Sequence, residues 1–375
     1  MSEWKTVRLG DYITEYSVKN KSNEDIPVYS VTNTQGFCTE YFSKDVSSKD
    51  KSNYKIVPRG CFAYNPSRIN VGSVDWQLYE DRVIVSPLYN VFKVSPELEN
   101  QYLYYFLKSD IGHTLITSKA EGSVRDNLKI TMLAEFSIPL PPLETQKQIA
   151  AQLDKCTSII TKHKQMLEKY DTLIKSRFIE MFGDNPIENG KWKVEKLGNL
   201  GLCKNGMNFS YEDNGFEINC LGVRDFKDHA VISNCEKLPV ISLNEKPSEE
   251  YLLKDNDIVF VRSNGNKELV GRSVLVHPRV LTTFSGFCIR FRLSTDSINH
   301  LFLLQFLKMP NTRKNMAGRG ANIQNLNQQI LSNLDIPVPQ IELQNDFASF
   351  VQQIDKSKFE IANSLKRLYN KGMLS

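Results

Sequence analysis

The sequence lacks a long hydrophobic run. Its mean hydropathy is −0.36, and no apolar segment reaches the ~18 residues that a transmembrane helix needs. The first residues, MSEWKTVRLGDY, also lack the apolar core of a signal peptide. We therefore expect a cytoplasmic protein with no membrane partner.

Cysteine and histidine offer no metal or disulfide pattern. The seven cysteines are scattered, odd in number and never spaced as C-x-x-C. The five histidines show no ligand spacing either. This usage is typical of reduced cytosolic thiols, and it argues against a zinc site and a disulfide framework. No metal site is expected.

Motifs for nucleotide-driven or catalytic chemistry are also missing. No G-x-x-x-x-G-K-[ST] loop exists, and Asn65-Pro66 is followed by Ser67-Arg68 and not by the Pro-aromatic pair of DNA amino-methyltransferases. Asp225-Phe-Lys227 has the terminal spacing of a nuclease site, but no Pro-Asp dipeptide precedes it. The chain is interpreted as non-catalytic and without a cofactor of its own. An enzyme with an unrecognised site is the least favoured alternative.

A long helical stretch is present at 142–184. Mostly apolar residues recur there in alternating steps of four and three, which is the 3.5-residue period of a helix that packs along a partner helix. A second stripe at Ile159, Met166 and Leu173 is predicted to widen this apolar face. The seam consists of Ile149, Leu153, Cys156, Ile160, His163, Leu167, Tyr170 and Ile174.

The same pattern returns 198 residues later. The phrase IPLPPLETQ, which ends at Gln146, matches IPVPQIELQ, which ends at Gln344. A second seam follows, and its register breaks once, where Lys358 faces Ile160. Two matching seams in one chain most simply pack against each other. The second seam consists of Phe347, Val351, Ile354, Ile361, Leu365 and Leu368.

Each helix follows a lobe of mixed composition. Both lobes show β-prone apolar runs, a short helix and a glycine-started loop in the same order. The predicted fold class is α+β, with two mixed α/β lobes in tandem repeat, each followed by a long helix. The expected boundaries are 1–141 for the first lobe, 142–184 for the central helix, 185–339 for the second lobe and 340–375 for the C-terminal helix.

Arginine, asparagine and glutamine gather in the predicted loops. Arginine can donate twice to guanine, and Asn or Gln can pair with adenine, so these side chains suit DNA reading. The net charge of +4 permits an anionic partner without demanding one. The alternative is that these are ordinary solvent-exposed loop residues without a role in binding. The candidates are Asn65, Arg68, Arg125, Asn127, Arg262, Ser263, Asn264, Arg272, Arg319, Gln324 and Asn325.

The repeated [IV]-P-[LV]-P-x-[LI]-E-x-Q phrase before a long helix resembles the specificity subunit (HsdS) of type I restriction–modification systems. The resemblance extends to Leu9-Gly10, Leu197-Gly198 and the segment NDIVFVRS at 256–263, which is close to the family's Gly-Asp-Ile-x-Phe-x-Arg. The sequence departs from the family pattern at two positions. In the first lobe Cys61 replaces the family's Asp, and in the second lobe Ile323 stands at the position where the first lobe has Arg125.

The resemblance implies that each lobe is a target-recognition domain for one half of a bipartite DNA site. It implies an antiparallel coiled coil as spacer, which docks two methyltransferase (HsdM) subunits. S-adenosylmethionine would lie on those subunits, and restriction (HsdR) subunits would bring ATP and magnesium. The lobes differ, which predicts an asymmetric target. Two alternatives stay open: a helical scaffold without DNA binding, and a related system that fuses methylation and cleavage.

Overall fold

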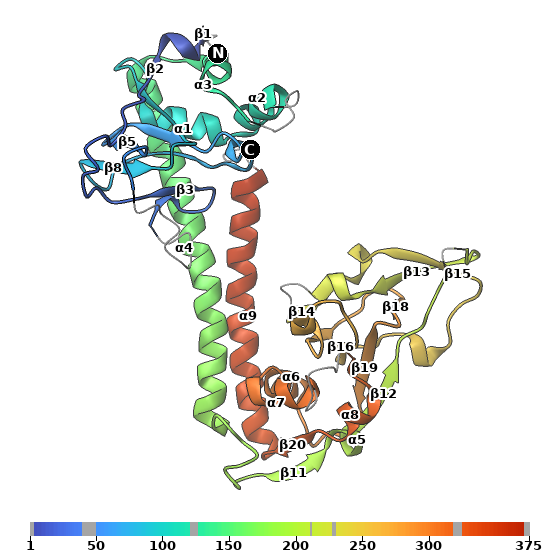
Figure 1. Cartoon of the computed structure of the whole chain (residues 1–375). Helices are drawn as coiled ribbons and strands as arrows, with labels where there is room; N and C mark the ends of the chain where they lie inside the picture. Colours follow the sequence, from blue (N-terminus) through green and yellow to red (C-terminus); the bar gives the residue numbers. More distant parts are fainter. Residues whose placement is uncertain are drawn as a thin grey trace. The chain divides into compact units, whose positions relative to one another are not determined.

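The computed structural model describes residues 4–39, 50–120, 127–210, 212–226, 230–317 and 325–370. The chain divides into two compact units (Figure 1). The first unit is Met1–Lys164 with Ala362–Ser375, and the second is Gln165–Ile361. The division crosses both long helices, so each unit contains a lobe and parts of two helices.

The first unit is built on a four-stranded sheet in the order β2-β9-β6-β7. Two further strand pairs lie beside it, and β1 pairs with the strand that precedes the long helix. The strands are β1 Lys5–Arg8, β2 Ile13–Glu15, β3 Ser30–Thr32, β4 Gly36–Cys38, β5 Lys55–Pro58, β6 Phe62–Tyr64, β7 Val74–Trp76, β8 Arg82–Val85, β9 Asn90–Val94 and β10 Ser137–Leu140. The helices of this lobe are α1 Asn100–Lys108, α2 Asp110–Ala120 and α3 Ile130–Leu133.

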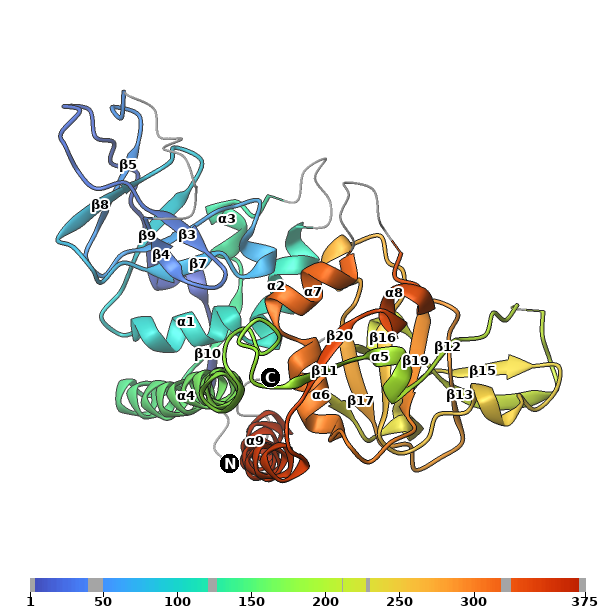
Figure 2. The same cartoon turned by 90° about the horizontal axis from the view of Figure 1, so that it is seen from below.

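The second unit contains a five-stranded sheet, β12-β19-β16-β17-β14, and a three-stranded sheet, β15-β13-β18. Helix α6 lies beside β17 (Figure 2). The strands are β11 Lys193–Lys196, β12 Gly201–Asn205, β13 Phe216–Leu221, β14 Val231–Ile232, β15 Val240–Leu243, β16 Asp257–Val261, β17 Ser273–Val276, β18 Thr282–Phe284, β19 Cys288–Leu293 and β20 Asp335–Val338. The helices of this lobe are α5 Leu197–Leu200, α6 His300–Leu307, α7 Pro310–Ala317 and α8 Gln328–Ser332.

The Leu-Gly pair that opens each lobe has the same physical role twice. Leu9 and Leu197 are fully buried. A Cβ on Gly10 would lie 2.8 Å from the carbonyl oxygen of Ala134, and one on Gly198 would lie 3.0 Å from the Cβ of Ser332. The missing side chain lets the lobe's first turn approach the segment that leads into the long helix.

The glutamine that ends each repeated phrase ties the long helix to the lobe through the hydrogen bonds of its amide. Gln146 and Gln344 are fully buried. The Oε1 of Gln146 accepts from the backbone N–H of Glu99 at 2.8 Å, and the Oε1 of Gln344 accepts from that of Asn299 at 2.8 Å. Each Nε2 donates to two backbone carbonyls. Every polar atom of the buried amide is thus used.

The two long helices, α4 Leu143–Phe182 and α9 Ile341–Asn370, confirm the predicted tandem arrangement. In the second unit the Phe347 ring of α9 contacts Phe178 and Phe182 of α4, at 5.4 and 5.8 Å between ring centroids. Further along α9, Lys358 forms an ion pair with Asp171. Residue numbers rise on one helix as they fall on the other, so these segments are antiparallel.

The predicted seam is buried or half-buried at every position for which burial is described. Its one polar interruption, Lys358, is accommodated by Asp171 and not by an apolar partner. The predicted second stripe of Ile159, Met166 and Leu173 adjoins the seam but stays open to solvent: these side chains are 42%, 41% and 45% exposed.

Candidate nucleic-acid interface

In the first unit, strand β6 delivers the loop that contains Asn65 and Arg68. The Asn65 Oδ1 accepts from the backbone N–H of Ser67 at 3.1 Å and from its hydroxyl at 2.9 Å, which fixes the loop in an Asx-type turn. Arg68 is exposed and immediately precedes a 3-10 turn at Ile69–Val71. The loop therefore presents a guanidinium on a rigid base.

A second segment lies against this loop. The backbone N–H of Leu128 donates to the carbonyl of Pro66 at 3.1 Å, and this places the preceding residue, Asn127, beside the loop. The Leu128 carbonyl accepts from the Tyr64 hydroxyl at 3.0 Å. Burial raises the pKa of Tyr64, so its hydroxyl stays a donor. The structure thus brings two predicted site segments together.

Arg68 and Asn65 also line a polar cavity of about 540 Å³. Asn33, Ser73 and Tyr89 are among the lining residues that the sequence did not indicate. Asn33 directly follows β3, so a polar residue at a strand end was the available signal. Ser73 and Tyr89 are buried, and nothing in their sequence context distinguishes them from core residues.

The second unit repeats this geometry with different side chains. Ser263 and Asn325 form an antiparallel β-bridge, and the backbone N–H of Leu326 donates to the Arg262 carbonyl at 2.8 Å. Asn264 accepts from the backbone N–H of Asn266 at 2.8 Å through its Oδ1. Arg262, Ser263, Asn264 and Asn325 are therefore one cluster.

Arg262 is also held by the turn at Gly286 and Phe287. Its Nη1 donates to the Gly286 carbonyl at 3.3 Å, and its backbone N–H donates to the Phe287 carbonyl at 2.8 Å. The Phe287 ring is 62% exposed. An exposed aromatic ring beside an arginine can stack on a base or on a sugar. The sequence reasoning missed Phe287 because it lies in a turn between two apolar strands.

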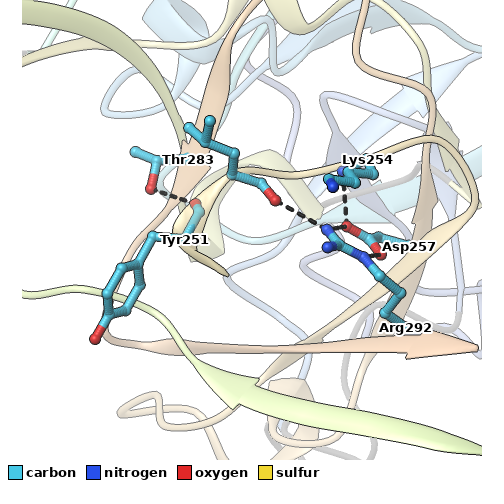
Figure 3. A network of polar contacts seen from close by, with 6 residues as sticks. Tyr251, Lys254, Asp257, Thr283 and Arg292 are labelled. Atoms are coloured by element: carbon cyan, nitrogen blue, oxygen red, sulfur yellow. Dashed lines mark hydrogen bonds and ion pairs between the residues drawn. The ribbon is translucent and has the colours of Figure 1, made fainter. Parts of the chain in front are cut away.

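An ion pair between Asp257 and Arg292 positions β16, the strand that ends directly before Arg262 (Figure 3). The Arg292 guanidinium donates to both oxygens of Asp257 at 2.7 Å, and it also donates to the Leu252 carbonyl at 2.9 Å. The Asp257 side chain is fully buried, and it accepts a third hydrogen bond from the backbone N–H of Lys254 at 2.7 Å. A bidentate pair of this kind fixes the register between β16 and β19.

The backbone conformation explains the glycine of the family's Gly-Asp-Ile pattern. Asn256, at the glycine position, has φ of 67°, and the matching Gly60 of the first lobe has φ of 83°. Both occupy the left-handed region, where glycine and asparagine are favoured. In the first lobe Cys61 replaces the aspartate, and Lys93 stands where the second lobe has Arg292; its ammonium lies 4.7 Å from the Tyr16 ring centroid.

Not every predicted site residue belongs to these clusters. Arg272 lines a different cavity, together with Lys308 and Arg313. Arg125, Arg319 and Gln324 lie outside the described residues. Across 4–39, 50–120, 127–210, 212–226, 230–317 and 325–370, no group of three or more His, Cys, Asp or Glu could hold a metal ion. In the same ranges no helix is long and apolar enough to span a membrane.

Comparison with known proteins agrees with this architecture. The chain is 28% identical over 291 residues to the type I restriction enzyme StySPI specificity subunit of Salmonella potsdam, and this match covers 71% of the chain and 62% of that subunit. It is 23% identical over 408 residues to the MjaVIII specificity subunit of Methanocaldococcus jannaschii, which covers 98% of the chain and 91% of that subunit.

Two solved structures share the fold. A chain from a type I restriction–modification system, described for its complex assembly and conformational transition, has a TM-score of 0.59 at 17% identity and covers 100% of this chain and 96% of its own length. The S subunit of a type I restriction–modification system from M. genitalium has a TM-score of 0.58 at 15% identity, and the match covers 99% of this chain and 95% of that subunit.

The family model described as "Type I restriction modification DNA specificity domain" matches residues 1–169 and 189–368. The two matches coincide with the internal duplication and confirm the resemblance drawn from the repeated phrase and the Leu-Gly openings. The chain therefore belongs to the type I restriction–modification DNA specificity family.

Proposed function

We propose that this chain is the non-catalytic DNA-recognition subunit of a type I complex, with each lobe reading one half of a bipartite, asymmetric site. The duplicated pair of loops carries the proposal. In each lobe a strand end and a segment before a short helix meet through one backbone hydrogen bond, Leu128 to Pro66 and Leu326 to Arg262. A repeated geometry with unlike side chains suits two readers of two different half-sites.

The chemistry of the loops supports base contacts. Arg68 and Arg262 offer bidentate donors for guanine, and Asn127 and Asn325 offer the amide that pairs with adenine. Phe287 would add a stacking surface in the second lobe. Arg125, Arg272, Arg319 and Gln324 remain proposed contacts, to bases or to phosphates.

The helices act as the spacer in this proposal. We keep the boundaries 1–141, 142–184, 185–339 and 340–375 for recognition lobe, spacer helix, recognition lobe and spacer helix. A rigid spacer fixes the separation of the half-sites, as it does in dimeric DNA-binding proteins. Two readers on one duplex also gain affinity, because the second contact is intramolecular.

The partners follow from the exposed stripe on α4. Ile159, Met166 and Leu173 repeat every seven residues and stay open to solvent, which supports docking of a partner helix. We propose double-stranded DNA and two methyltransferase (HsdM) subunits as direct partners, and restriction (HsdR) subunits through them, in the cytoplasm. S-adenosylmethionine, ATP and magnesium would lie on those partners. The chain's net charge of +4 is small, so tight DNA binding would need the assembled complex.

Co-expression with a cognate methyltransferase subunit, followed by sequencing that reports modified bases genome-wide, tests the proposal. It predicts one methylated motif of two unlike halves separated by a fixed gap. A stable complex that contains S-adenosylmethionine yet modifies no DNA would favour the scaffold alternative. Cleavage by the same partner chain would indicate the fused system.

A further inference from the structure

A basic cavity of about 530 Å³ lies in the second unit. It is enclosed by the C-terminal part of α4, the junction of α6 and α7, strand β17 and helix α9. Among the described residues, five cations line it against two carboxylates, Asp171 and Asp355, so the formal net charge of these side chains is +3. The cations are Lys175, Arg272, Lys308, Arg313 and Lys358.

The tandem repeat provides an internal comparison for one of these cations. Lys108, at the end of α1, donates through Nζ to the carbonyls of Gly72 and Asn33. Its counterpart Lys308, at the end of α6, makes no side-chain hydrogen bond or ion pair to any residue in the described ranges. The same position is therefore occupied by a hydrogen-bonded lysine in one lobe and, in the other, by a lysine that forms no hydrogen bond or ion pair with any described residue.

The two neighbouring carboxylates do not outweigh the effect of burial on Lys308. Asp171 is engaged by Lys358, and Asp355 is itself withdrawn from water, so that burial raises the pKa of its carboxyl. Burial lowers the pKa of Lys308 to about 8, despite the two carboxylates that favour its charge. The Arg313 guanidinium donates to the Glu268 carbonyl at 2.8 Å and the Val270 carbonyl at 3.2 Å, which fixes it in the wall.

A second and independent observation concerns Ser273. Its side chain lines the same cavity and the residue is only 3% exposed. Among the residues that the structure describes, its hydroxyl has no hydrogen-bond partner, and the hydroxyl oxygen is itself shielded from solvent. Buried hydroxyls without a partner are uncommon, because the desolvation cost is of the order of 1–3 kcal/mol. Ser273 and Lys308 therefore bring two donors that lack hydrogen-bond partners among the described residues to the lining of one cavity.

We propose that this cavity binds a phosphate monoester or inorganic phosphate. A phosphate dianion supplies several oxygens that accept hydrogen bonds from ammonium and hydroxyl donors such as Lys308 and Ser273, and its charge opposes the net +3 of the described lining residues. A volume of about 530 Å³ exceeds the needs of one phosphate, so it leaves room for an organic group such as a nucleoside. The proposal does not depend on the bases that the lobes recognise.

Thermal unfolding and calorimetric titration of the full chain, at constant ionic strength, test this site. Inorganic phosphate and adenosine monophosphate are the probes, with chloride as the reference anion. Saturating probe is expected to raise the Tm of the wild-type chain by several degrees. Tighter binding of adenosine monophosphate than of phosphate would identify the ligand as a nucleotide, and equal affinity would identify it as free phosphate.

Three variants separate the site from general effects. Lys308→Met should abolish the phosphate-dependent shift and raise the Tm without probe, because it removes a charge that burial disfavours. Ser273→Ala should weaken probe binding about 3- to 10-fold, and the exposed Lys237→Met should leave it unchanged. The proposal is overturned by an equal shift in Lys308→Met, by no shift in the wild-type chain, or by duplex DNA replacing phosphate as the ligand that Lys308→Met loses.

Discussion

The backbone N–H of Leu326 donates to the carbonyl of Arg262 at 2.8 Å, and that of Leu128 donates to the carbonyl of Pro66 at 3.1 Å. These two bonds join segments more than 60 residues apart at the same place in each lobe. They depend only on the backbone, so the side chains around them can change freely. Such an arrangement permits each lobe to keep its frame while its reading residues diverge.

The ion pair between Asp257 and Arg292 is expected to stabilise the second lobe. Asp257→Asn keeps the shape but leaves the guanidinium without its charge partner, which typically costs about 3–5 kcal/mol in a buried site. Urea denaturation of the full chain measures the free energy of unfolding. The control is Asp255→Asn, whose side chain is exposed and should change stability by less than about 1 kcal/mol. Equal losses in both variants would contradict the assignment.

Gln344 is expected to be essential to the join between the second lobe and α9. Gln344→Ala leaves the N–H of Asn299 and the carbonyls of Ser297 and Pro339 without their partner, at a cost of about 2–4 kcal/mol. Gln340→Ala, at an exposed position four residues earlier, should be close to neutral. Calorimetric unfolding compares the two, and similar Tm values would show that water replaces the lost amide.

Two adjacent residues of α4 test the helix seam. Ile174 is buried, whereas Leu173 is 45% exposed. Ile174→Asp places a charge in the apolar core and should destabilise the second unit by roughly 3–5 kcal/mol, because an unpaired buried carboxylate is costly. Leu173→Asp should cost less than about 1 kcal/mol and instead weaken binding of the methyltransferase subunit. Circular dichroism melting and co-purification separate the two effects.

Lys308 predicts a pH dependence of stability. Its pKa in the folded chain is about 8, below its ordinary value of 10.5, so the unfolded chain binds more protons between these limits. The free energy of unfolding of the wild type should therefore rise, relative to Lys308→Met, as the pH increases from about 8 to 10.5. The facing groups also belong to the variant and largely cancel in the difference: Asp171, Lys175, Arg272, Arg313, Asp355 and Lys358. Parallel pH curves would contradict the burial of Lys308.

The duplicated architecture could be predicted from the sequence because its signals are local. The 3.5-residue period, the repeated phrase and the Leu-Gly pairs each depend on residues close together in the chain. The exposure of Ile159, Met166 and Leu173 could not be predicted, because periodicity alone does not say how much of an apolar face a partner helix covers.

The site was only partly predictable for a related reason. Arg262, Ser263 and Asn325 meet through a β-bridge between distant segments, and loop composition indicated all three. Phe287 and Ser73 contribute through tertiary contacts that leave no local pattern. The structural roles of Gln344 and Asp257 also became clear only with their partners, since a buried amide or carboxylate looks the same in sequence as an exposed one.

The most direct test of the two-reader account is methylome sequencing of cells that co-express the methyltransferase subunit with the wild-type chain, Arg68→Ala or Arg262→Ala. The account predicts that Arg68→Ala relaxes one half of the methylated motif and Arg262→Ala relaxes the other, while the gap between the halves stays the same. Each lost bidentate contact should reduce discrimination by about 1–3 kcal/mol. Loss of methylation at both halves in either variant, or an unchanged motif in both, would contradict it.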